Sequence, residues 1–378
     1  MKISDEELFQ GVQFPDKPAV APKTTGVKVV VVEPKLTNDQ IKAREGTYFS
    51  EKDADQIFDE DVDVYAKDET APGGKKLILR LRKNVIPREI IEIGWKNFNG
   101  AASASRNRGA AAGPIDLNSN YWKKRKPTAI DKWSARYVQN GKVSKMRVNN
   151  NVFSSVLGYF EQTPFMGLPC RLTSYTQQYF NEFKEGQPFI AHIDKLFKAL
   201  VPERHKIQYK QAHAKPQFQI GDTAFSSVTI NRNFRTGLHM DDGDLRAGFG
   251  NLTVIERGKY QGGYTLFPRY KIGINLRTGD FVAMDVHEWH CNTELRESAD
   301  DKKFNEKLPE IHANAKETGT QGVEKKFDRL SFVCYLREKL INCDPKKSMT
   351  YYKRIGYNPK TKTMTRKKNR NQNVQNIE

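Results

Sequence analysis

The chain has few cysteines and no long hydrophobic run. The first argues against a cysteine-based zinc site or disulfide framework, and the second against a membrane span. Its four cysteines, Cys170, Cys291, Cys334 and Cys343, show no C-x-x-C spacing. Neither a zinc site nor a disulfide framework is indicated, so we expect reduced thiols. No run of eighteen apolar residues is present, and the first ten residues lack a hydrophobic signal region. We therefore expect an intracellular protein without a membrane span.

Acidic residues are also in the minority. The chain has 63 Lys and Arg against 45 Asp and Glu, for a formal net charge of +18, and its pI is near 9.5. A polyanion is the natural partner of such a charge, although a basic surface can also serve solubility alone. We expect a monomer that binds DNA, with RNA as the alternative. Its expected location is the nucleus in a eukaryote, and otherwise the cytoplasm or a virus-infected cell.

Residues 226–340 contain several short segments of strand-like composition, separated by Gly, Asn and Asp turns. The segments are 227–234, 252–255, 264–268, 272–276, 281–285 and 329–336. Many short strands of this kind are typical of an antiparallel β-sandwich or jelly roll. In such a roll, strands that are distant in the sequence become neighbours.

The same region carries a candidate metal site. His239 and Asp241 are two residues apart, and in an extended strand such residues point to the same side. His290 follows about fifty residues later, and Arg329 opens the last apolar segment. Two imidazoles and one carboxylate can occupy one face of an octahedral Fe(II) and leave three positions open. A lone H-x-D pair is a weak signal, but its surroundings strengthen it.

Three segments, at residues 231–270, 276–295 and 328–338, resemble the TET/JBP family of Fe(II)/2-oxoglutarate dioxygenases. This family oxidises the 5-methyl group of pyrimidines in nucleic acid. The H-x-D-x-G-D-L, Gly-Gly and F-P-R-Y elements are more similar to the base-J-binding-protein thymine hydroxylases than to the animal 5-methylcytosine enzymes. The resemblance implies an α+β fold whose core is a double-stranded β-helix (jelly roll) with buttressing helices.

The resemblance also implies the ligand set. Fe(II) would be held by His239, Asp241 and His290, with 2-oxoglutarate as cosubstrate and O2 as oxidant. His287 is the competing distal histidine. Arg329 corresponds to the family's cosubstrate anchor, because a planar guanidinium matches a carboxylate in two parallel hydrogen bonds. Arg296 and Arg337 are the competing arginines. Asn231 or Asn233 would hold the cosubstrate's other carboxylate.

The rest of the chain is predicted to surround this core. Residues 1–75 read as an irregular, partly ordered extension with a strand at 27–33 and a mobile acidic loop at 53–63. Residues 76–340 form the dioxygenase domain, with its roll core at about 226–340. It includes a strand at 75–83, apolar helices at 152–160 and 188–200, and a polar insert at 297–326. Residues 341–378 form a basic tail, which has ten Lys or Arg and no Asp or Glu between positions 346 and 370.

Two segments are candidate nucleic-acid contacts. Residues 99–114 are rich in Gly and Ala and contain Arg106 and Arg108. Small residues permit close approach, so this loop is expected against a phosphate backbone or near the substrate pocket. An ordinary surface loop is the alternative. In residues 121–126, two aromatics precede Lys123, Lys124, Arg125 and Lys126. This combination suits base stacking together with phosphate neutralisation. The alternative is a solvated run of charges.

Together these observations predict an enzyme that hydroxylates the methyl group of thymine or 5-methylcytosine in DNA after flipping the base out of the duplex. The alternatives are a prolyl or lysyl hydroxylase of the same fold, or a DNA-binding module with an inactive roll. The sequence leaves the choice between thymine and 5-methylcytosine open.

Overall fold

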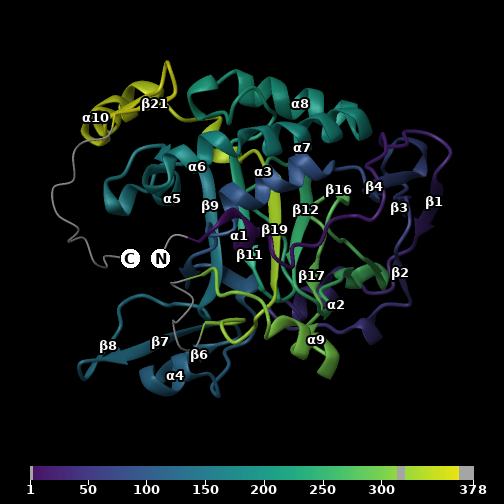
Figure 1. Cartoon of the computed structure of the whole chain (residues 1–378), viewed down its shortest axis with the longest axis horizontal. Coiled ribbons are helices and arrows are strands. Elements are labelled where there is room, and N and C mark those ends of the chain that lie inside the picture. The colour runs from purple at the N-terminus through teal and green to yellow at the C-terminus, as the bar shows by residue number, and fades with distance from the viewer. Residues whose placement is uncertain (1–2, 313–319, 366–378) are drawn as a thin grey trace.

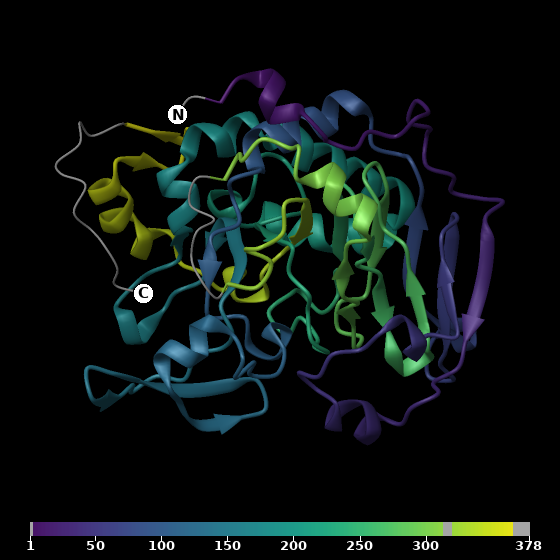
Figure 2. The ribbon, with the colours of Figure 1, turned by 60° about the horizontal axis from the view of Figure 1, so that its bottom comes forward.

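Two β-sheets face each other and helices cover the outer face of the larger one (Figures 1 and 2). The computed structural model describes residues 3–312 and 320–365. In order across the larger sheet lie β1 (Lys28–Val32), β3 (Val62–Lys67), β4 (Lys75–Arg82), β16 (Phe281–Met284), β12 (Gly250–Arg257), β19 (Asp328–Tyr335), β11 (Ser227–Arg232), β9 (Val152–Phe160) and β10 (Arg171–Leu172), with β5 (Ala104–Ser105) beside β9. The smaller sheet contains β17 (Cys291–Asn292), β14 (Thr265–Phe267), β15 (Ile272–Ile274) and β2 (Gln56–Phe58).

Successive side chains along each strand of the larger sheet point to opposite faces, so the core has two layers. In β19, Leu330, Phe332 and Cys334 join the cluster of apolar side chains under the helices. The side chains between them point the other way, into the space between the sheets. That space is filled at one end by an apolar cluster to which β12, β14, β15 and β16 all contribute. The arrangement confirms the predicted jelly roll with buttressing helices.

The helical layer packs mainly through α3 (Arg88–Phe98) and α7 (Gln187–Leu200). Phe189 of α7 meets Phe332 of β19 with ring centroids 4.9 Å apart. The apolar side chains of α7 recur at helical spacing and are buried, which confirms the predicted helix at 188–200. Shorter or outer helices complete the layer: α5 (Ser174–Gln178), α6 (Phe180–Glu185) and α8 (Pro202–His213). None of the helices that the structure describes is long and apolar enough to cross a bilayer.

The predicted helix at 152–160 is wrong. These residues form β9, which pairs antiparallel with β11 inside the larger sheet. Eight of its nine residues are buried, so both faces of the strand are covered. A strand buried on both faces has no polar and apolar alternation, and its apolar residues then imitate a helical pattern.

The N-terminal residues belong to the two sheets. The predicted strands at 27–33 and 75–83 are confirmed as β1 and β4. The predicted mobile acidic loop at 53–63 is wrong, because it contains β2 and the start of β3. β2 adds to the smaller sheet by pairing with β15. Two short helices, α1 (Asp5–Phe9) and α2 (Asn38–Ala43), flank these strands.

A small basic module projects from the roll at the bottom left of Figure 1. It consists of α4 (Asn120–Arg125) and three antiparallel strands, β6 (Pro127–Asp131), β7 (Ser134–Gln139) and β8 (Lys142–Val143). Its own core contains Tyr121, Trp122, Ala135 and Val148. The indole Nε1 of Trp122 donates to the Oδ1 of Asn150 at 2.8 Å, which ties the module to the segment that leads into β9.

The polar insert predicted at 297–326 begins with α9 (Ala299–Asn305). Residues 313–319 of the insert lie outside the described part of the chain. A two-stranded ladder, β13 (Gln261–Gly262) with β18 (Leu295–Arg296), lies just before it.

The sequence favours a weakly ordered arm for the basic tail, and the alternative is a segment whose Tyr351, Tyr352 and Tyr357 pack against the roll. Over residues 341–365 the arm is wrong and the structure has the alternative. They form α10 (Pro345–Ile355), β20 (Tyr357–Asn358) and β21 (Thr363–Met364). Tyr352 and Tyr357 are buried in the core beneath the helices. The hydroxyls of Tyr357 and Tyr159 lie 2.9 Å apart, which joins this segment to β9. The predicted tail beyond residue 365 falls outside the described residues.

The prediction of four reduced thiols is also wrong. Cys170 and Cys343 form a disulfide, with Cα atoms 6.2 Å apart across a sequence separation of 173. Cys291 and Cys334 are free and buried. The pairing could not be read from the sequence, because only the fold brings the two segments together.

Tyr352→Ala should lower the free energy of unfolding by about 3 kcal/mol or more, because it leaves a cavity in the main core. Thermal or urea unfolding measures the loss. Met349→Ala is the matched control: Met349 lies on the same helix but is exposed, so the change should stay within about 0.5 kcal/mol. If Tyr352→Ala left stability unchanged, α10 would not be part of the core.

Candidate active site

His239, Asp241 and His290 come together between the two sheets. His239 and His290 exchange backbone hydrogen bonds, each with an N–O distance of 3.0 Å. Asp241 extends the same segment, and its backbone N–H donates to the Val286 carbonyl. The Asp241 carboxylate oxygens lie 3.7 Å from Nε2 of His239 and 3.8 Å from Nε2 of His290. One candidate ligand atom from each residue lies within 4.8 Å of the others, a spacing that can hold one metal ion.

Both imidazoles are oriented by backbone carbonyls. The Nδ1 of His239 lies 2.8 Å from the Gly237 carbonyl oxygen, and the Nδ1 of His290 lies 2.9 Å from that of Glu288. A carbonyl only accepts, so each Nδ1 carries the proton and each Nε2 presents a lone pair. This is the tautomer that a metal ligand needs. Burial, reinforced by the neighbouring His239, lowers the pKa of His290 to about 4. His290 is therefore neutral at pH 7.

His287, the competing distal histidine, lies outside this group. Its Nδ1 faces the Asp285 carboxylate at 3.4 Å and its Nε2 lies 3.2 Å from the Asp244 carbonyl oxygen. Asp285 also pairs with Lys76 at 2.7 Å. Burial alone would raise the pKa of Asp285, but the bond to His287 and the charge of Lys76 hold it at about 2. His287 thus braces the segment that leads to His290.

Among the three candidate anchor arginines, Arg329 alone is a buried cation without an ion pair in the described structure. Its Nε is buried and has no hydrogen-bond partner. Its position in β19 points it between the sheets, beside Gly263. Arg337 instead pairs with Glu161, and Arg296 is an exposed partner of Glu51.

The carboxylate opposite Arg329 is already engaged. Glu256 is the cross-strand partner of Arg329 in β12. One of its oxygens pairs with Arg277 at 3.2 Å and accepts from the Tyr260 hydroxyl. The other accepts from the Thr278 N–H at 2.7 Å. The buried guanidinium of Arg329 therefore calls for an anion that the described residues do not supply.

The two candidate asparagines have different surroundings. Asn231 lies in a polar row across three neighbouring strands, since its Oδ1 accepts from Ser154 of β9 and its Nδ2 is 3.4 Å from Ser331 of β19. Asn233 binds backbone instead: it accepts from the Arg329 N–H and donates to the Phe327 carbonyl. Asn231 therefore faces the interior next to Arg329, whereas Asn233 fixes the start of β19.

Arg108 was predicted to contact nucleic acid from a loop lying either against a phosphate backbone or near the substrate pocket. Its side chain reaches into the site, where Asp241, Tyr335 and Arg337 are its electrostatic neighbours, and burial lowers its pKa. Its Nε is buried without a hydrogen bond. The small residues around it explain the approach, because a Cβ at Gly237 would meet the Ala110 carbonyl oxygen at 2.9 Å. The alternative prediction, a loop beside the pocket, describes this arrangement.

The remaining predicted nucleic-acid contacts lie in or beside α4. Lys123, Lys124 and Lys126 are exposed. The Arg125 guanidinium stacks over Tyr121 at 4.1 Å from its ring centroid. Arg106 interacts with the Tyr121 hydroxyl. The aromatics of this run are thus core residues of the basic module, and its lysines form the solvent-facing side.

The chain matches a known family over the stretch that contains the trio. Residues 155–338 match the Tet_JBP model, described as the oxygenase domain of the 2OGFeDO superfamily. This stretch is a Tet_JBP oxygenase domain. The superfamily depends on Fe(II) and 2-oxoglutarate. The match begins in β9 and ends just after β19, so it includes all three residues of the trio and Arg329.

Named relatives agree with this assignment. The chain is 33% identical over 190 residues to "Bifunctional helicase and thymine dioxygenase JBP2" of Leishmania infantum, a match that covers 50% of this chain and 15% of that protein. It is 35% identical over 144 residues to "Thymine dioxygenase JBP1" of Trypanosoma brucei brucei, covering 38% of this chain and 17% of the relative. The match thus spans less than a fifth of the length of either relative.

Among solved structures, NgTET1 in complex with 5mC DNA aligns over 87% of this chain and 91% of that chain, with a TM-score of 0.45 and 10% identity. So low a TM-score supports no conclusion about the substrate of this chain.

Proposed function

We propose that this chain oxidises the 5-methyl group of a pyrimidine, thymine or 5-methylcytosine, in DNA. The observation that carries the proposal is the His239, Asp241 and His290 group inside a Tet_JBP oxygenase domain. Both histidines have the tautomer suited to ligation, and the carboxylate completes a facial triad for Fe(II). With both relatives named as thymine dioxygenases, thymine is the favoured base.

Iron and 2-oxoglutarate fit the residues that are present. His239, Asp241 and His290 would hold Fe(II), and Arg329 would bind the far carboxylate of 2-oxoglutarate, with Asn231 beside it. The bound metal and cosubstrate supply, with O2, the oxidising power needed to attack a methyl group. The protein's own share is to orient the imidazoles, fix the cosubstrate at its far end and exclude water from the space between the sheets.

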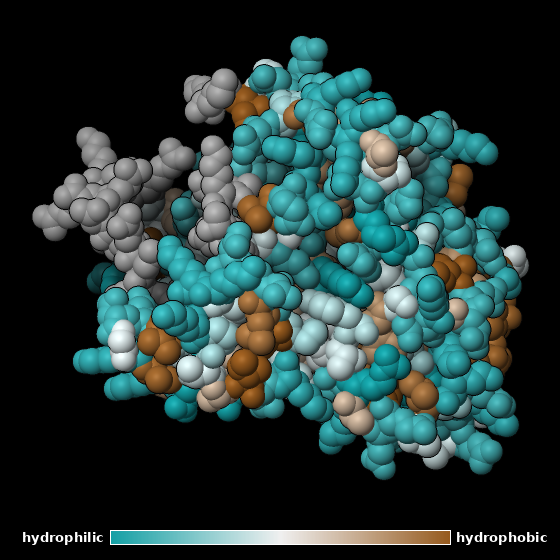
Figure 3. All heavy atoms as spheres, turned by 90° about the horizontal axis from the view of Figure 1, so that it is seen from below, coloured by the Kyte–Doolittle hydropathy of each residue, from teal (hydrophilic) through white to brown (hydrophobic). Residues whose placement is uncertain are grey.

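The proposed partner is DNA. The net charge of +18 favours a polyanion. Seen from below, where the basic module lies, the surface is mostly hydrophilic with separate hydrophobic spots (Figure 3). A base inside a duplex cannot reach a metal between two sheets, so the target nucleotide must be flipped out. Lys123, Lys124 and Lys126 would contact phosphates, and Arg106 with Arg125 would support them. An intracellular location and a monomeric state remain predictions.

The test is product analysis after incubation with Fe(II), 2-oxoglutarate and O2. The substrates are a thymine duplex, a duplex with 5-methylcytosine and a proline- and lysine-containing peptide. Mass spectrometry of the nucleosides should show a hydroxymethyl product from at least one duplex, with one succinate per product. Succinate release with the peptide alone would indicate a protein hydroxylase. DNA binding without product from any substrate would indicate an inactive roll.

A further inference from the structure

A closed turn follows β9 and exposes an apolar tip. Thr163 and Leu168 exchange backbone hydrogen bonds of 2.8 and 3.2 Å, which close the loop. Pro164–Met166 forms a single 3-10 turn, and Gly167 ends it in the left-handed conformation. Phe165 is 81% exposed and Met166 is 53% exposed at this tip.

The base of the turn is held firmly. The Arg171 guanidinium donates to the Glu161 carbonyl, the Pro169 carbonyl and the Thr163 hydroxyl, at 3.1 to 3.2 Å. Cys170, at the end of the loop, is bonded to Cys343. A turn whose base is held at so many points cannot easily fold its aromatic tip back into the core. Phe165 is therefore presented to a partner at little cost in ordering.

The turn is close to the candidate active site. Glu161 pairs with Arg337 through two hydrogen bonds. The next residue, Glu338, donates its N–H to the carbonyl of Gly243, two residues beyond Asp241. Phe165 comes four positions after Glu161, so the Cα atoms of the two residues lie within about 14 Å of each other.

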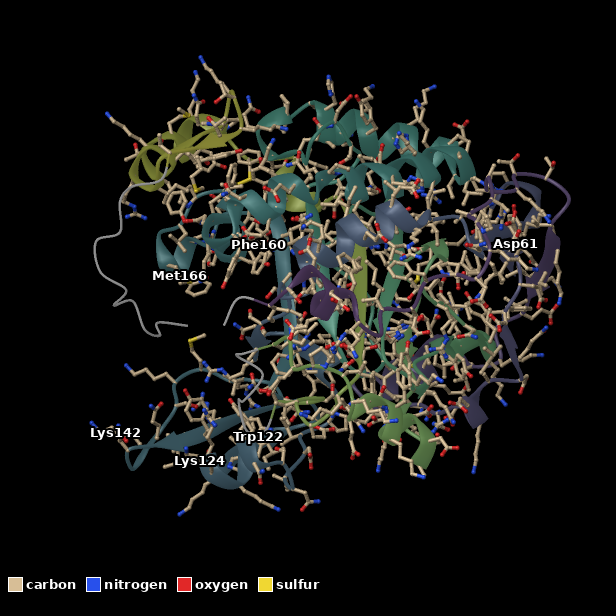
Figure 4. All side chains as sticks on the ribbon, viewed as in Figure 1. Asp61, Trp122, Lys124, Lys142, Phe160 and Met166 are labelled. Atoms are coloured by element: carbon tan, nitrogen blue, oxygen red, sulfur yellow. A yellow bond between two sulfur atoms is a disulfide. The ribbon has the colours of Figure 1, made fainter. Side chains whose placement is uncertain are left out.

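The turn and the basic module share one flank of the molecule. Figure 4 places Met166 on the same side as Lys142 and Lys124, with Met166 above them. Figure 2 also shows the end of β9 and the β7–β8 hairpin on this side. Lys142 and Lys145 of the hairpin are exposed, and neither has an ion pair within the described residues. An exposed aromatic ring on the same flank as exposed cations suits a nucleic acid, whose bases stack and whose phosphates are anionic.

We propose that Phe165 is a wedge that enters the base stack of duplex DNA and stabilises the extruded target nucleotide, with Met166 beside it. The inference rests on the proposed function and extends it to how a duplex is opened. Extruding a base breaks stacking on both its sides, and apolar side chains such as Phe, Met and Pro are used to fill or open such steps. The basic module holds the phosphates while the tip enters the stack. A single strand needs no such opening.

The experiment compares wild type, Phe165→Ala, Phe165→Trp and Ile207→Ala as full chains. Each is given one target sequence as a duplex and as a single strand, and the ratio of the two turnover rates is measured. Ile207 is the matched control, because it is an exposed apolar residue on α8, away from this flank. A second readout is the fluorescence of 2-aminopurine placed next to the target base in the duplex, which rises when the stack opens.

Phe165→Ala should lower the ratio of duplex to single-strand turnover by about tenfold or more, because the energy of unstacking is no longer offset. It should also abolish the fluorescence rise on binding the duplex. Phe165→Trp should restore both, and Ile207→Ala should change neither. If Phe165→Ala kept both the turnover ratio and the fluorescence rise of the wild type, the wedge would be overturned. The turn would then be a surface for another partner.

Failure of the wedge and failure of the proposed function are distinguishable. If the wild type oxidised neither DNA, the proposed function would fall. The fluorescence readout needs no turnover and would still decide the wedge. A rise with wild type that is lost in Phe165→Ala supports it, and no rise with wild type overturns it.

Discussion

Replacing His239 or Asp241 by Ala should reduce product formation by more than roughly 100-fold. Loss of a supporting group around a metal ligand already costs 10–100-fold, and loss of the ligand itself must cost more. His290→Ala should have the same effect, because its Nε2 faces the same carboxylate. Succinate release and nucleoside mass spectrometry measure the activity. The visible spectrum of added Co(II) reports metal binding independently of turnover.

His287→Ala is the matched control for this prediction. His287 braces Asp285 and the Asp244 carbonyl rather than facing the metal ligands. It should retain Co(II) binding and part of the activity. DNA affinity should be unchanged in all four variants, since the phosphate contacts are assigned to the basic module. An active His290→Ala with an inactive His287→Ala would show that the distal ligand is the other histidine.

The sequence predicted those features that depend on local periodicity. The two-residue step from His239 to Asp241 places both side chains on one side of an extended segment, as the structure has them. The strand at 329–336 and the helix at 188–200 also carry clear repeats, and both are confirmed. The ligand trio required one step more. His290 reaches His239 through pairing of segments that are distant in the sequence, which the predicted roll allowed and the family resemblance implied.

The errors have a common physical cause, which is contact between distant segments. The apolar residues of β9 are buried on both faces by elements far away in sequence, so no local pattern identifies the strand. In the tail, the frequent cations favoured an arm over the packing of Tyr357, whose partner Tyr159 is 198 residues away. For Arg108 the sequence left open whether its loop lies against a phosphate backbone or near the substrate pocket, because the loop is short of apolar residues. Its inward position depends on packing of that loop against Gly237.

Arg329→Met should weaken 2-oxoglutarate binding by about 100-fold. A bidentate pair of charge-assisted hydrogen bonds, at about 1.5 kcal/mol or more each, is lost while the volume of the side chain is kept. The readouts are the apparent KM for 2-oxoglutarate and the rise in melting temperature that the cosubstrate causes. That rise follows from binding to the folded state alone and should disappear in the variant.

The protein without cosubstrate gives the sharper test. Arg329 is a buried cation with no ion pair in the described structure, so its removal should leave the melting temperature unchanged or higher. Arg337→Met should do the opposite: it breaks the pair with Glu161 and lowers stability, with little change in KM. Arg296→Met, at an exposed pair, should change neither. If Arg337→Met raised the KM and Arg329→Met did not, the cosubstrate would be anchored at the other end of β19.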